Sequence, residues 1–111
     1  MPFDDLYRRW RGVPFPHGSH RDDVDELHAD LALVDTWVAE TVVPYVERGL
    51  IAPPPKVDIG AGVQGIRNRV RVLRDGATGE ELAILNRYMD YVDLIDELYV
   101  AFRKEHPEQF T

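Results

Sequence analysis

Carboxylates at three-residue intervals form the most regular polar pattern in the sequence. Asp23 and Glu26 show this spacing, and Asp90, Asp93 and Asp96 repeat it further along the chain. In a helix, residues three apart lie on one face, so each set can present its carboxylates together. Two such faces opposite one another could hold Mg²⁺ and a nucleotide phosphate. One hypothesis is therefore a small metal-dependent hydrolase that acts on a nucleotide or another phosphorylated substrate.

The arrangement of these carboxylates is similar in principle to that of all-helical nucleotide pyrophosphohydrolases of the MazG kind. The motifs of that family are glutamate-led and more closely spaced, so the likeness is limited to the use of helix-borne carboxylates. The alternative interpretation of the same pattern is a solvated acidic surface.

Two histidines offer a second set of metal ligands. His17 and His20 are three residues apart in a segment rich in proline and glycine, close to Asp22 and Asp23. Imidazole and carboxylate groups bind zinc or nickel. Because histidines are also common in exposed loops, an ordinary loop is the alternative.

Two further aspartates, Asp35 and Asp96, occur among apolar residues at helical spacing. A buried carboxylate without a partner is costly, so each aspartate needs a cation or a raised pKa. Arg67, Arg71 and Arg74 are spaced along one side of a helix and are the natural partners. We expect ion pairs that fix helix packing, with a ligand site as the alternative.

The segment from Gly60 to Gly65 reads G-x-G-x-x-G, which is the spacing of a dinucleotide-binding loop. That chemistry needs a strand before the glycines and a parallel sheet around them. The run before the glycines, Val57 to Ile59, is only three residues long and follows a triple proline, and no parallel sheet can be built from the rest. We therefore expect a flexible connection that binds neither nicotinamide nor flavin, and no cofactor apart from Mg²⁺ in the hydrolase hypothesis.

The elements that must position these residues are helical by their three- and four-residue apolar periodicity. The sequence predicts an all-α bundle of two long antiparallel helices, with a short basic helix and an N-terminal helical arm. An α+β fold with a β-hairpin at about 66–85 is the alternative, because Arg69 to Val72 alternate as in a strand. The predicted segments are an arm at 1–21, a helix at 22–48, a connection at 49–62, a short helix at 63–74 and a long helix at 79–105. Pro44 should kink or end the first long helix.

The composition sets limits on function. The chain has 111 residues, which indicates one domain, and its net charge of −7 argues against nucleic acid as a partner. It has no cysteine, which excludes disulfides and thiolate metal sites. No long apolar run and no basic N-terminal leader are present, so we expect no membrane association and a cytoplasmic location.

The last predicted helix is apolar around most of its circumference, so it needs cover on several sides. One chain has few elements to supply that cover, which predicts a homodimer. We expect the interface to contain four side chains of this helix, Tyr88, Tyr91, Ile95 and Phe102. The preferred hypothesis is thus a non-enzymatic interaction or assembly protein that acts through homodimerisation or by binding a partner helix. The alternative is a monomer in which the arm and the proline segment cover the same stripe.

Overall fold

The structure is a computed structural model that describes residues 2–16 and 22–107. Every regular element in these two ranges is helical, which confirms the all-α bundle. The β-hairpin alternative is wrong, because 66–75 and 79–85 lie in two separate helices. The elements are α1 (Pro2–Gly12), α2 (Asp22–Trp37), the π-helical turn η1 (Val38–Val42), α3 (Val43–Arg48), α4 (Ile59–Asp75) and α5 (Gly79–Glu105).

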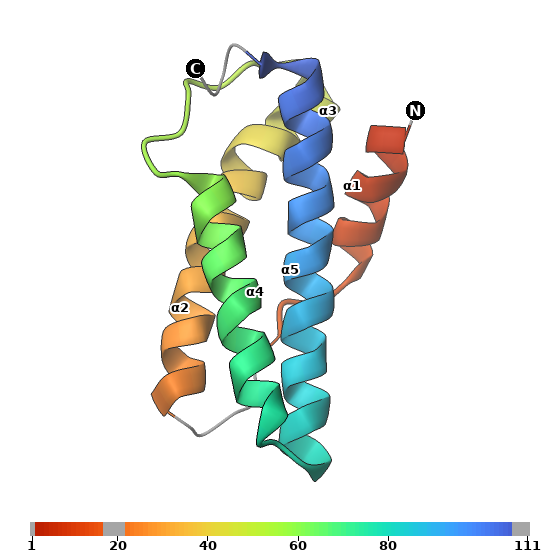
Figure 1. The fold of residues 1–111 in the computed structure, drawn as a ribbon. Coiled ribbons are helices and arrows are strands. Elements are labelled where there is room, and N and C mark those ends of the chain that lie inside the picture. Colours follow the sequence, from red (N-terminus) through yellow and green to blue (C-terminus); the bar gives the residue numbers. More distant parts are fainter. Residues whose placement is uncertain (1, 17–21, 108–111) are drawn as a thin grey trace.

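The two long helical segments run parallel, and the expected antiparallel arrangement is wrong (Figure 1). His28 contacts Tyr88, and further along both segments Tyr45 contacts Phe102, so residue numbers rise in the same direction. The reason is the length of α4, whose 17 residues span the bundle. Because α4 runs back along both neighbours, the helices before and after it must point the same way.

Helix α4 begins four residues earlier than the sequence predicts. The Asp58 carboxylate caps it by accepting a hydrogen bond from the backbone N–H of Ala61 at 3.0 Å. The glycine motif is therefore inside a helix, and the expected connection at 49–62 ends at Asp58. Two of the glycines allow close packing: a Cβ at Gly60 would lie 3.0 Å from Tyr99 Oη, and one at Gly62 would lie 3.2 Å from Val34 Cγ1.

These glycines give a prediction about helix stability. Gly65 has open space around its missing Cβ, so Gly65→Ala is expected to stabilise the fold by about 0.5–1 kcal/mol through helix propensity. Gly60→Ala should lose this gain because its Cβ meets the Tyr99 ring. Urea unfolding of both variants measures the difference. An equal gain at Gly60 would contradict the close packing of α4 against α5.

The segment predicted as one helix at 22–48 is interrupted just before Pro44. The helix widens into η1 over Val38–Val42 and then continues as α3, which ends at Gly49 with φ +66°. A proline ring crowds the carbonyl four residues earlier, and a wider turn makes room for it. The expected irregularity at Pro44 therefore takes the form of a π-helical turn. Gly49 adopts the left-handed conformation that commonly ends helices.

The core lies where α2, α4 and α5 meet, and α1 lies along α5 (Figure 1). The four side chains predicted for the dimer interface belong to this core, since Tyr88, Tyr91, Ile95 and Phe102 are all at most 3% exposed. That placement corrects the sequence prediction, because α1, α2, α3 and α4 supply the cover that a second copy was expected to give. Among the described helices, none is long and apolar enough to cross a membrane.

Candidate functional site

Arg67 lies between two of the carboxylates on α5. Its Nε is 3.0 Å from Asp93 Oδ1, and its Nη1 donates a hydrogen bond to Asp96 Oδ2 at 3.2 Å. The antiparallel packing of α4 against α5 brings these residues together, and the side chains of Arg67 and Asp96 are each 24% exposed. One guanidinium therefore contacts both carboxylates and offsets one of their two charges, an arrangement suited to holding two helices in register.

The other two predicted arginines do not contact either aspartate. Arg74 donates to the side-chain oxygen of Asn86 at 3.2 Å, and the exposed Arg71 donates to that of Asn68 at 3.4 Å. Because α4 and α5 run in opposite directions, Arg74 lies level with Asn86, ten residues before Asp96. The neighbouring Arg69, which the prediction omitted, pairs with Asp30 of α2.

Asp35 has neutral partners, so the expected ion pair with an arginine is wrong. It accepts a hydrogen bond from Trp10 Nε1 of α1 at 3.0 Å and another from the Tyr91 hydroxyl of α5. Burial, together with this bond to Asp35, raises the pKa of Tyr91 well above its ordinary value. Asp35 thus joins three helices at one point.

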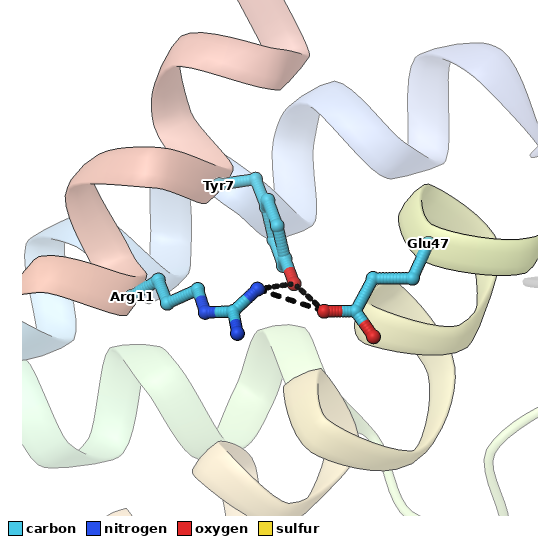
Figure 2. Close-up of polar contacts among 3 residues, drawn as sticks. All are labelled: Tyr7, Arg11 and Glu47. Carbon is cyan, nitrogen blue, oxygen red and sulfur yellow. Dashed lines mark hydrogen bonds and ion pairs between the residues drawn. The ribbon is translucent and has the colours of Figure 1, made fainter.

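A second junction holds α1 against α3 (Figure 2). The Tyr7 hydroxyl and Arg11 Nη1 both donate to Glu47 Oε1, at 2.9 and 2.8 Å. Burial raises the pKa of the Tyr7 phenol, and the hydrogen bond to Glu47 raises it further. Sequence analysis missed these contacts because the partners are 40 and 36 residues apart and no local pattern marks them.

The proposed metal ligands are dispersed. Glu26 and Asp90 are exposed on different helices, and Asp93 is paired with Arg67. Within residues 2–16 and 22–107, no group of three His, Asp or Glu side chains lies close enough to hold a metal ion. His17, His20 and the side chain of Asp23 lie outside the described part of the structure.

The most exposed large apolar side chains of the described residues are Val72, Leu33 and Val57, at 71%, 65% and 60% exposure. Leu33 and Val57 line a groove of about 470 Å³ between the proline segment and the end of α2, with Trp37 in its wall. Arg69 of α4 pairs with α2. Val72 comes three residues after Arg69, so Val72 also lies on the α2 side of α4. We call the surface formed by Leu33, Val57, Gly65 and Val72 the α2–α4 face.

The α2–α4 face also combines opposite charges. Helix α2 carries six carboxylates and no lysine or arginine, whereas α4 carries four arginines and one aspartate. Arg69 is exposed on the α2 side of α4, and Glu26 is exposed on α2, four residues before its partner Asp30. An apolar centre flanked by opposite charges is typical of a protein-binding surface.

Comparison with known proteins returned no match: no family model, no curated protein and no solved structure is similar to this chain.

Proposed function

We propose that the protein is a non-enzymatic interaction protein that assembles as a homodimer through its α2–α4 face. The observation that carries this proposal is the 60–65% exposure of Leu33 and Val57 beside one groove, with the 71% exposed Val72 further along the same side of α4. Solvated apolar groups grouped on a helical surface gain free energy when a partner covers them. The predicted interface on α5 is replaced, because its side chains are already covered within the chain.

A second copy fits this face by both charge and shape. A twofold axis parallel to the helices places α2 of one copy opposite α4 of the other, so that acidic and basic helices face each other. Val34 contacts Gly62 and Asp30 contacts Arg69, so Leu33 lies at about the height of Gly65. The open space at Gly65 can therefore receive Leu33 of the partner copy.

Light scattering at micromolar concentration tests the proposal. We expect a mass twice the 12.8 kDa of the chain, and a mass of one chain for Leu33→Glu, because a charge would be buried against the partner. Leu33 is exposed, so its replacement leaves the core intact. Leu50→Glu is the matched control, since Leu50 is 52% exposed but lies outside the face.

Charge reversal adds a test of orientation. Glu26→Arg should weaken the dimer, because it places a cation opposite the basic helix α4 of the partner copy, whereas Arg71→Glu, on the α5 side of α4, should not. A monomeric wild-type protein would overturn the proposal, and a dimer that survives Leu33→Glu would show that another surface is used. The dimer should also weaken at high salt, because exposed charges are screened.

A further inference from the structure

Helix α1 is packed incompletely against the rest of the molecule. Three cavities of about 660, 350 and 320 Å³ lie along the boundary of α1 and the following residues 13–16 with α5. Leu6, Trp10 and Phe15 are only partly buried there, whereas Tyr7 and Pro16 are buried. Apolar packing therefore holds α1 less firmly than it holds the core helices.

Polar contacts with carboxylates supply much of the remaining attachment. Trp10 bonds Asp35, Arg11 bonds Glu47, and Arg9 Nη2 pairs with Glu97 Oε2 at 2.7 Å. The two ion pairs are more than 40% exposed on every side chain, so each contributes little on its own. The basic end of α1 thus rests on a surface that offers acidic groups from α2, α3 and α5.

That surface also offers carboxylates beyond those that contact α1. The α5 walls of the three cavities contain five carboxylates and two cations, around an apolar strip of Leu94, Val100 and Ala101. The carboxylates are Asp90, Asp93, Asp96, Glu97 and Glu105; Asp93 and Asp96 share Arg67 of α4, and Glu97 pairs with Arg9 of α1. An apolar strip with an acidic rim is complementary to a helix that has aromatic and apolar residues on one face and arginines beside them.

We propose that this acidic surface is a docking site for a basic amphipathic helix of a partner protein, and that α1 is its intramolecular occupant. The partner helix carries the pattern of α1: aromatic residues three apart, as Tyr7 and Trp10 are, with arginines at the positions of Arg9 and Arg11. It binds after α1 moves aside, so the free energy holding α1 sets the affinity. The site is separate from the α2–α4 face, because Leu33 and Asp35 point to opposite sides of α2.

A labelled synthetic peptide of residues 2–16 is the probe. In the wild-type chain the tethered α1 competes at an effective concentration in the millimolar range. The Trp10→Ala substitution leaves the acidic surface unchanged and weakens only the binding of α1 to it. We expect the peptide to bind this variant at least about tenfold more tightly than the wild type, as measured by fluorescence anisotropy.

Two controls make the result specific. A peptide with Arg9→Glu and Arg11→Glu should lose at least about tenfold in affinity, because it meets like charges. A peptide with the same residues in scrambled order should not bind. If it bound as tightly as the peptide of residues 2–16, the surface would be attracting cations in general and not a specific helix. If Trp10→Ala fails to fold, Trp10→Phe, which keeps an aromatic ring and removes the donor to Asp35, replaces it.

Three outcomes would overturn the proposal. One is peptide binding that is equal for the wild-type and variant chains. Another is absence of binding although hydrogen exchange shows that α1 has opened. The third is exchange of α1 between two wild-type copies, detected by energy transfer between labelled chains, because the occupant would then be a second copy. None of these results depends on the dimer, which Leu33→Glu tests separately.

Discussion

Asp35→Ala is expected to lower the free energy of unfolding by about 2–5 kcal/mol. The change removes the common acceptor of Trp10 Nε1 and the Tyr91 hydroxyl, and each buried donor left without a partner costs about 1–3 kcal/mol. For a domain with a total stability of about 5–15 kcal/mol this is a large fraction. Urea unfolding measures the loss, and hydrogen exchange should show faster opening of α1 than of α4.

Two substitutions separate the contributions to this junction. Asp35→Asn keeps one acceptor oxygen, so it should cost less than the alanine change. Tyr91→Phe removes one donor and leaves the bond between Trp10 and Asp35 in place. A loss below about 0.5 kcal/mol for Asp35→Ala, the size of a typical surface substitution, would show that this carboxylate does not hold the three helices together.

Stability is expected to fall steeply above pH 10. Burial and the bond to Asp35 raise the pKa of Tyr91, and burial and the charge of Asp25 raise that of Tyr88, both from an ordinary value of 10.0. The folded state therefore keeps protons on Tyr88 and Tyr91, and on Tyr7, whose pKa is raised as well, that the unfolded chain loses as the pH rises. Each proton that only the folded state holds lowers the free energy of unfolding by up to about 1.4 kcal/mol per pH unit.

Urea midpoints between pH 8 and pH 11 measure this dependence. Stability from these groups is fully present below pH 10 and is lost as the pH approaches their raised values. Tyr91→Phe should reduce the slope by one proton, because Tyr88 and Tyr7 still titrate. A flat profile up to pH 11 would mean that these phenols are accessible to water in the folded state.

Local signals in the sequence were sufficient for most helix positions. The ends of α5 follow from apolar periodicity between Gly79 and Glu105, and Gly49 marks the end of α3 as the sequence predicts. The start of α4 was missed because Gly60 and Gly62 have low helix propensity on their own. Their place in a helix depends on Tyr99 and Val34, which pack against them and are distant in sequence.

The candidate sites were harder to predict because they depend on which helices are neighbours. Arg67 was identified as a partner for Asp96 from charge and helical spacing, and it contacts that residue. The partners of Asp35 depend on where α1 docks, and no spacing rule links Trp10 to Asp35. The burial of Tyr88 and Phe102 likewise depends on the packing of α2, α3 and α4 around α5.

The position of α5 in the chain order has a consequence for synthesis. Helices α1, α2 and α4 all pack on α5, yet α5 follows them in the sequence. The contact between Arg9 and Glu97 alone joins residues 88 apart. As the chain leaves the ribosome, the apolar faces of the earlier helices therefore have no complete core to enter until α5 has emerged. Folding during translation should be late and abrupt, with α1 docking in its final step.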